Sequence, residues 1–292
     1  MRERSTLLAY LALAAAIAGI SWSAILVRWA EIPGSASAFY RVLIAGAVLM
    51  PWRLARGATR PPPHRAAVWT AVAGGVFFAL DLALWNTAVL RTQVAVASIL
   101  GNNTPIFVGL MSWFVLRRRP RAPFWIGLAL AMAGAVAIMS VNLRSGDGGT
   151  GSVSGDLMAL AASVFFAAYL ITTERIRATM DTLTFNTLAI AGSIATLLAV
   201  CLALDLPMTG YSTRTWLALA GLGLISQLGA YYALVYALGH LPATITSVGL
   251  LAQVPCTALL AALLLAEPLT AIQLAGGAIV LAGIYVVNRD GG

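Results

Sequence analysis

Long apolar runs, separated by short polar connections, make up nearly the whole of this chain. A helix needs about 20 mostly apolar residues to cross a bilayer. Read between proline, glycine and charged residues, the pattern predicts an all-α integral membrane protein with ten transmembrane helices. The predicted helices cover residues 6–27, 36–56, 67–89, 92–115, 122–140, 155–175, 183–203, 213–237, 244–266 and 270–288.

The second half of the chain repeats the pattern of the first. At a constant offset of 150 residues the matched positions are Pro105 with Pro255, Asp81 with Tyr231, and Asn103 with Gln253; Trp22 matches Phe166 at an offset of 144. Because each half has five spans, an odd number, the second half enters the membrane from the opposite side. The repeat therefore predicts two inverted five-helix units around a central cavity, as in many secondary transporters.

The polar stretch in the middle of the chain divides it into two units. Its glycine and serine content is typical of a flexible linker. We expect a first five-helix repeat at 1–145, a linker at 146–154 and a second repeat at 155–292.

Charge places the protein in a membrane and sets its expected orientation. The chain is 60% hydrophobic and 10% charged, against about 25% charged in soluble proteins. All 18 basic residues are arginines that flank apolar runs, a distribution that excludes a nucleic-acid partner. With the N-terminus in the cytoplasm, 13 arginines lie inside and four outside, as the positive-inside rule requires. We expect a multi-pass protein of a bacterial inner membrane, surrounded by lipid, with both termini cytoplasmic.

Two ionisable residues fall well inside predicted spans, at about 8 and 10 Å from the outer surface. These are Arg41 and Asp81. Buried charges in membranes usually face a wet cavity or a partner. Either the two side chains pair, or they hold opposite ends of a zwitterion. Independently of that choice, proton coupling through Asp81 is a possible feature of transport. The alternative is that Arg41 extends to the outer headgroups and Asp81 stabilises a local hydrogen-bond network.

The matched prolines lie inside predicted helices and mark expected points of flexing. A proline breaks the hydrogen bond to the carbonyl four residues earlier, and such exposed backbone is tolerated where it lines a cavity. We therefore expect Pro105 and Pro255 to act as conformational hinges. The amides beside them are expected to face the pathway; these are Asn102, Asn103 and Gln253. The alternative for these amides is helix–helix hydrogen bonding.

Further candidates share helix faces with these residues. Phe78, Asp81 and Trp85 lie on one face of the third predicted helix, and Gln227 and Tyr231 lie on one face of the eighth. An apolar or cation-binding cage is expected from the aromatic residues Trp22, Tyr40, Phe78, Trp85, Tyr231 and Tyr232. The alternative for the tryptophans and tyrosines is a position at the membrane interface.

No sequence pattern indicates catalysis, a cofactor or a metal. There is no glycine-rich phosphate loop followed by lysine, and no His, Cys or Asp cluster with metal-ligand spacing. Cys201 and Cys256 fall inside apolar runs and are expected to be packing residues. We therefore expect no metal site, no cofactor and no enzyme activity.

Three segments resemble a known family. Trp85 to Leu116 has an aromatic start, small residues and a mid-helix proline; its partner, Tyr232 to Thr270, ends in Glu267-Pro268-Leu269-Thr270. Phe39-Tyr40-Arg41 resembles the family's start of the second helix. Together they resemble the drug/metabolite transporter superfamily, EamA type, over nearly the whole chain. The first half departs from the pattern in having Arg117 to Arg119 where the second has Glu267.

The resemblance implies ten helices, cytoplasmic termini and export of amino acids or other metabolites; the layout is also similar to aromatic amino acid exporters of the YddG type. We expect a secondary-active or facilitative exporter of aromatic or hydrophobic amino acids that works by alternating access. The alternatives are an exporter of drug-like organic cations and, in a different class, a membrane enzyme or lipid-handling protein.

Overall fold

The computed structural model describes residues 2–56, 63–91, 94–144, 152–265 and 270–289. Every regular element in these ranges is a helix, which confirms the all-α prediction for this part of the chain. The helices are α1 (Arg2–Ala30), α2 (Gly34–Arg56), α3 (Arg65–Arg91), α4 (Val94–Gly101), α5 (Thr104–Phe114), α6 (Ala122–Arg144), α7 (Val153–Arg177), α8 (Thr182–Ala203), α9 (Thr213–Gly221), η1 (Leu222–Tyr231), α10 (Tyr232–Leu238), α11 (Ala243–Leu250), α12 (Gln253–Leu265) and α13 (Ala271–Arg289). Nine helical segments of the described ranges are long and apolar enough to cross a membrane.

The predicted fourth and ninth helices are not continuous, which corrects the sequence prediction. The run at 92–115 is divided into α4 and α5, with residues 92–93 outside the described ranges. The run at 244–266 is divided into α11 and α12. Each break falls within four residues before a matched proline, because proline has no N–H with which to continue the helical ladder. Both halves of the chain thus contain a broken helix at the same place.

The predicted eighth helix, 213–237, contains an unexpected π-helical segment. It consists of α9, the ten-residue π-helix η1, and α10. A Cβ on Gly223 would lie 3.1 Å from the Arg41 carbonyl oxygen, so η1 packs closely on α2. π-helical segments are often found at functional sites, and this one carries Gln227 and Tyr231.

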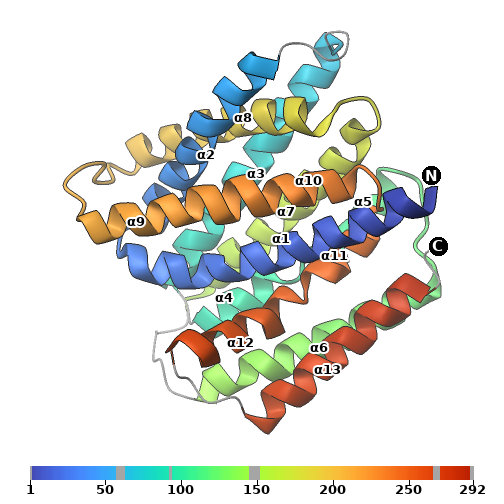
Figure 1. Cartoon of the computed structure of the whole chain (residues 1–292). Helices are drawn as coiled ribbons and strands as arrows, with labels where there is room; N and C mark the ends of the chain where they lie inside the picture. Colours follow the sequence, from blue (N-terminus) through green and yellow to red (C-terminus); the bar gives the residue numbers. More distant parts are fainter. Residues whose placement is uncertain (1, 57–62, 92–93, 145–151, 266–269, 290–292) are drawn as a thin grey trace.

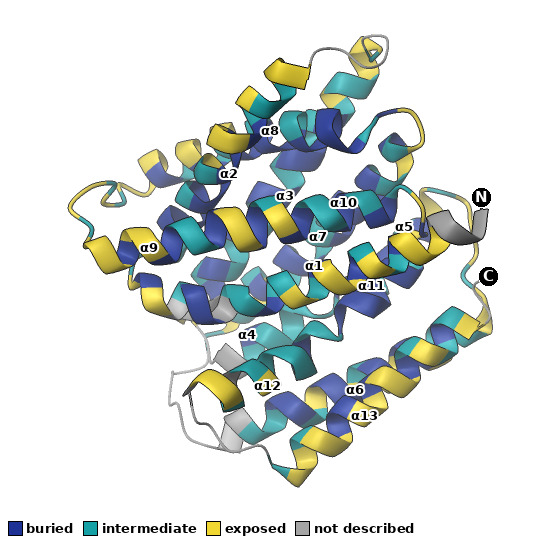
Figure 2. Ribbon diagram, in the orientation of Figure 1, coloured by how far each residue is buried: buried dark blue, intermediate teal, exposed yellow. Residues whose placement is uncertain are grey.

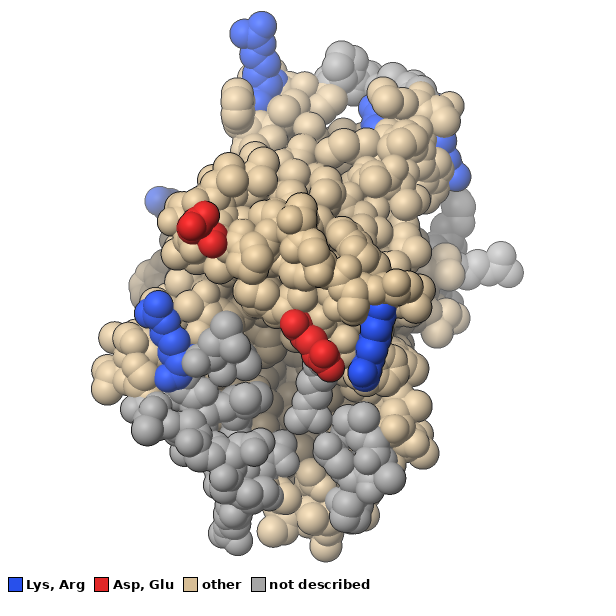
Figure 3. Space-filling model, turned by 90° about the vertical axis from the view of Figure 1, so that its left-hand side faces the viewer, with Lys and Arg blue, Asp and Glu red and all other residues tan. Residues whose placement is uncertain are grey.

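The helices form a main bundle with a separate pair along one side (Figure 1). In the bundle, α3 packs against α7 and α8, while α2 and α1 pack against η1. The pair consists of α6 and α13, which contact each other more extensively than any other two helices. The burial of residues agrees with this arrangement (Figure 2). The helix faces that point into the bundle are buried, and those that point away from it are exposed and apolar. Figure 3 shows a side of the molecule that is largely uncharged, as expected for a surface in contact with lipid.

Glycines allow α6 and α13 to touch along their backbones. A Cβ on Gly127 would lie 2.5 Å from the carbonyl oxygen of Gly283, and one on Gly134 would lie 2.5 Å from that of Gly276. The contacts pair the early residue of one helix with the late residue of the other, so the two helices run antiparallel. Small residues that permit such close approach are typical of helix packing in membranes.

A second close approach fixes α3, which carries Phe78 and Asp81. A Cβ on Gly75 would lie 1.9 Å from the carbonyl oxygen of Ala189 on α8, too near for any side chain. At the same place the Ser193 hydroxyl donates a hydrogen bond of 2.7 Å to the Gly75 carbonyl. This contact sets the distance of α3 from its neighbour.

Candidate functional site

Arg41 is buried where three helices meet. Its side chain is bound inside the protein and does not extend to the outer headgroups, since Arg41 is only 7% exposed. The Nε group donates to Gln227 Oε1 on η1 at 2.8 Å, and Nη1 donates to Ser23 Oγ on α1 at 3.2 Å. The guanidinium carbon lies 5.2 Å from the centre of the Tyr231 ring. The sequence thus identified Arg41, Gln227 and Tyr231, which the structure brings together, but it gave no reason to choose Ser23.

Asp81 lies near Arg41 without forming an ion pair with it. Asp81 is half-buried on α3, and Arg41 is the charged group that acts on its carboxylate. No hydrogen bond or salt bridge within 4.0 Å joins the two side chains, and Asp81 has no hydrogen-bond partner among the described residues. A guanidinium has five N–H donors, of which Gln227 and Ser23 occupy two. The Arg41 guanidinium thus keeps unused donors, and it lies close enough for its charge to act on the Asp81 carboxyl group.

Four aromatic rings pack beside these charges; we call them the aromatic cluster. Its members are Phe78, Phe166, Tyr169 and Tyr231. The Phe78 ring centre is 4.7 Å from that of Tyr231 and 5.1 Å from that of Tyr169. Phe78 and Tyr231 were expected from the sequence, whereas the two residues from α7 were not. The repeat contained a signal for one of them, because Phe166 is the match of Trp22.

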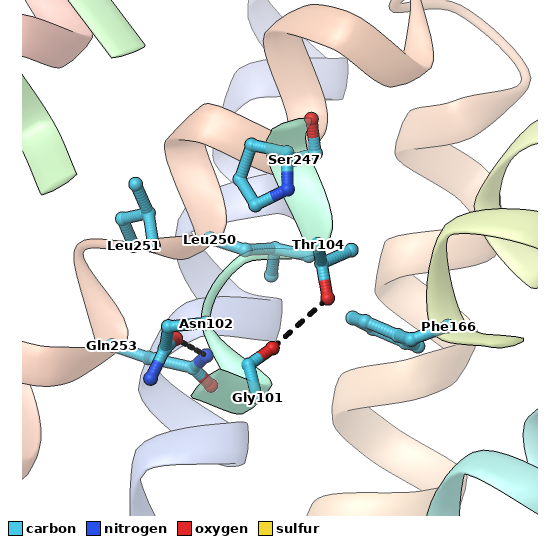
Figure 4. A pocket seen from close by; sticks show the side chains of 9 residues that line it. Gly101, Asn102, Thr104, Phe166, Ser247, Leu250, Leu251 and Gln253 are labelled. Atoms are coloured by element: carbon cyan, nitrogen blue, oxygen red, sulfur yellow. Dashed lines mark hydrogen bonds between the residues drawn. The ribbon is translucent and has the colours of Figure 1, made fainter. Parts of the chain in front are cut away.

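The two helix breaks meet through a pair of amides. Gln253, at the start of α12, donates through Nε2 to Asn102 Oδ1 at 3.3 Å, as Figure 4 shows. Asn102 in turn donates to the Ser98 carbonyl of α4 at 2.8 Å. The amides therefore tie the broken helix of one half to the broken helix of the other.

Asn103 and the backbone carbonyls at the breaks have local partners. Asn103 Nδ2 donates to the carbonyls of Ile99 and Leu100 at 3.2 and 3.1 Å, and so caps the end of α4. The Gly101 carbonyl accepts a hydrogen bond of 3.1 Å from the Thr104 hydroxyl. The Leu251 carbonyl accepts one of 3.0 Å from the Val254 N–H. The expected release of carbonyls is thus seen, but other protein groups satisfy them.

A cavity of about 40 Å³ lies between the two breaks (Figure 4). It has room for a few waters at most, so a metabolite would need the surrounding helices to move. Phe166 lines this cavity and also belongs to the aromatic cluster, and it thereby joins the two groups of candidates. Trp85 packs at the same place: a Cβ on Gly101 would lie 3.0 Å from its indole nitrogen. The full lining is Gly101, Asn102, Thr104, Pro105, Phe166, Ser247, Leu250, Leu251 and Gln253.

The remaining candidates lie at other places. Trp22 packs against the apolar cluster that α1 forms with α9 and η1. The Tyr40 hydroxyl donates to the carbonyl of Met208, which lies beyond the end of α8. The centre of the Tyr40 ring is 5.0 Å from that of the Trp216 ring. Pro105 is buried in the first turn of α5, and Pro255 is the third residue of α12. The structure therefore does not bring Trp22 and Tyr40 into the aromatic cluster. Within the described ranges, no group of three His, Cys, Asp or Glu side chains could hold a metal ion.

Comparison with known proteins gives a consistent result. A model of the EamA-like transporter family matches residues 6–140 and 153–289. The uncharacterized transporter YwfM of Bacillus subtilis (strain 168) is 29% identical over 254 residues, which cover 85% of this chain and 82% of that protein. An uncharacterized transporter of Archaeoglobus fulgidus is 31% identical over 70% of this chain and 71% of its own length.

An exporter and a solved structure are also similar to this chain. The pseudopaline exporter CntI of Pseudomonas aeruginosa is 28% identical over 74% of this chain and 73% of that protein. One crystal structure superposes with a TM-score of 0.78 over 100% of this chain and 99% of its own, at 21% identity. At this identity the superposition shows the shared fold.

Proposed function

Because the chain belongs to the EamA-like transporter family and is a multi-pass membrane transporter, we propose that it exports amino acids with aromatic or hydrophobic side chains across the bacterial inner membrane. The observation that carries this proposal is the burial of Arg41 against Tyr231 of the aromatic cluster, with Asp81 close enough for the Arg41 charge to act on it. Arg41 and Asp81 keep donors and acceptors unused.

The charges match the two ends of a zwitterion. The guanidinium of Arg41 would hold the amino acid's carboxylate, and Asp81 would hold its ammonium group. Hydrogen bonds to charged groups contribute about 1.5–3 kcal/mol each. They are strongest when a guanidinium and a carboxylate form two parallel N–H···O bonds. The aromatic cluster would then receive the side chain, as in an aromatic amino acid exporter of the YddG type.

We further propose ten spans in two inverted halves that rock against each other. In this arrangement α4 and α5 together make the span that neither is long enough to make alone. The antiparallel contact of α6 with α13 supports the inversion, as does the double match of the family model. The halves correspond to 1–145 and 155–292, both termini lie in the cytoplasm, and Pro105 and Pro255 mark the flexible points.

Direction and coupling are part of the same proposal. The similarity to an exporter in Pseudomonas aeruginosa supports export. Asp81 is the acidic group beside the pathway and would carry any coupled proton.

Export of organic cations is the second candidate. Aromatic rings and a carboxylate suit a cation, but the charge of Arg41 acts on that carboxyl group and would repel a positive ligand. The similarity to transporters points away from an enzyme or lipid-handling protein.

Counterflow in proteoliposomes tests the proposal. Vesicles containing the protein are loaded with one unlabelled compound and given a trace of the same compound in labelled form: tryptophan, phenylalanine, leucine or the poorly membrane-permeant cation methyl viologen, with and without a proton gradient. We expect accumulation of the aromatic amino acids. Arg41→Gln should abolish it, whereas Arg214→Gln, at an exposed arginine, should not. Accumulation of the cation alone, or of no compound by folded protein, would refute the amino acid proposal.

A further inference from the structure

One carboxylate, that of Glu174 on α7, holds two other parts of the chain. Its Oε2 accepts a hydrogen bond of 2.9 Å from the backbone N–H of Ala243. Its Oε1 accepts one of 2.9 Å from Nη1 of Arg118. The Glu174 side chain is 15% exposed.

The two partners belong to the two broken helices. Ala243 is the first residue of α11, and Arg118 follows the end of α5. In the proposed orientation α5 and α11 are the cytoplasmic halves of their spans. They pack against each other and against α7, whereas the outer halves α4 and α12 make at most marginal contact with each other. The structure is therefore tightly packed at the cytoplasmic end of the helix breaks.

The two contacts of Glu174 differ in strength. The N-terminus of a helix carries unpaired N–H groups and a partial positive charge, which a carboxylate stabilises. Arg118 is 71% exposed, and ion pairs in contact with water contribute little. The bond to α11 is therefore the stronger connection.

A second residue on α7 reinforces the same end. Arg177 donates from Nε to the Val235 carbonyl of α10 at 3.2 Å, and a Cβ on Gly239 would lie 2.7 Å from its guanidinium. The end of α7 thus holds both the helix that leads into the α10–α11 connection and the helix that follows it.

We propose that Glu174 is the positioning residue that keeps the cytoplasmic end of the transport pathway closed, by holding the first turn of α11 to α7. The cavity at the helix breaks would become accessible from the cytoplasm when this bond opens. This inference rests on the proposed alternating access, but its test requires no knowledge of the transported compound.

Labelling of a cysteine at the cavity tests the proposal. Ser247 lines the cavity and is 2% exposed, so Ser247→Cys reports access to it. A membrane-impermeant maleimide is applied to the full-length protein in vesicles of either orientation, and labelling without this substitution is subtracted to account for the native cysteines. We expect Glu174→Ala to accelerate labelling from the cytoplasmic side about fivefold or more, the factor for loss of a helix N-cap, and not from the other side.

Three further variants separate the contacts. Glu174→Gln keeps an oxygen for the Ala243 N–H but loses the charge, and should have an intermediate effect. Arg118→Gln removes the exposed ion pair alone and should have little effect. Glu31→Gln is the matched control, because Glu31 pairs with Arg214 at 3.8 Å with both side chains about 70% exposed.

Hydrogen–deuterium exchange of the same variants gives a second measurement. The first turn of α11 should exchange faster in Glu174→Ala, while α6 and α13 stay unchanged. Equal acceleration of labelling from both sides would indicate general loosening and refute the proposal, as would unchanged labelling in a folded Glu174→Ala protein. If labelling changes as expected but no amino acid shows counterflow, the proposed substrate is refuted, whereas the proposed role of Glu174 is not.

Discussion

Two neighbouring glycines on α3 should respond in opposite ways to substitution by alanine: one substitution should lower the stability of the protein and the other should not. A Cβ on Gly75 would lie 1.9 Å from the Ala189 carbonyl oxygen, whereas one on Gly74 would lie 3.5 Å from its nearest neighbour, a methyl group of Thr172. Gly75→Ala must therefore push α3 away from α8, and Gly74→Ala fits into existing space.

The expected magnitudes follow from these contacts. Overpacking costs about 1–3 kcal/mol, and displacing the carbonyl that accepts from Ser193 costs about 0.6 kcal/mol more at the average found in membranes. At about 2–4 °C per kcal/mol, Gly75→Ala should lower the unfolding temperature by roughly 3–14 °C. Gly74→Ala gains helix propensity of up to about 1 kcal/mol and should raise the unfolding temperature by at most about 4 °C.

Intrinsic tryptophan fluorescence during heating in one detergent measures both variants against the unaltered protein. Size-exclusion chromatography before heating shows that each sample is folded and monodisperse. Equal unfolding temperatures for the two variants would refute the close approach of α3 to α8. A larger decrease in unfolding temperature for Gly74→Ala than for Gly75→Ala would refute it as well. Either result would also refute the placement of Phe78 and Asp81 on α3.

Three other changes have defined outcomes. Phe166→Leu should raise the KM for tryptophan more than that for leucine in counterflow, because a ring of the aromatic cluster is lost; equal changes would argue against a role in selecting side chains. Tyr40→Phe removes the hydrogen bond to the Met208 carbonyl and should lower stability by about 0.6 kcal/mol, measured by thermal unfolding. Asp181 caps α8 by accepting from the Thr184 N–H at 3.0 Å; burial opposes its ionisation, but the hydrogen bonds from Thr184 prevail and lower its pKa. Asp181→Ala should therefore cost about 1 kcal/mol at neutral pH, and the difference from the unaltered protein should diminish as the pH falls below the ordinary value of 3.8, which unfolding temperatures across a pH series would show.

The repeat in the sequence predicted where the helices would be interrupted, but not how. It placed Pro105 and Pro255 at equivalent points, and both helices break just before them. It did not predict the complete break after α4, which is accompanied by the amides of Asn102 and Asn103 capping the last turn of that helix. Such side chains compete with the helical ladder wherever geometry allows, and only the fold fixes that geometry.

The candidate site was predictable where charge identified it and not where packing did. Arg41 and Asp81 were identified because charge inside a bilayer is costly. Tyr169 is an aromatic residue on a helix with many apolar residues, and sequence gives no reason to prefer it to others. Glu174 lies near the end of an apolar run, where charged residues are common. Its main partner is the backbone N–H of Ala243, and the sequence does not show which backbone N–H group a side chain will bind.

The seam between α6 and α13 has the form of a two-fold symmetric dimer interface. The Gly127 position meets the Gly283 carbonyl and the Gly283 position meets the Gly127 carbonyl, and Gly134 and Gly276 are related in the same way. Such isologous contacts are usual between identical subunits, and here a single chain makes them with itself. Each glycine is consequently constrained by a residue in the other half of the chain. A larger side chain at any of the four positions would clash with the backbone carbonyl of its partner glycine.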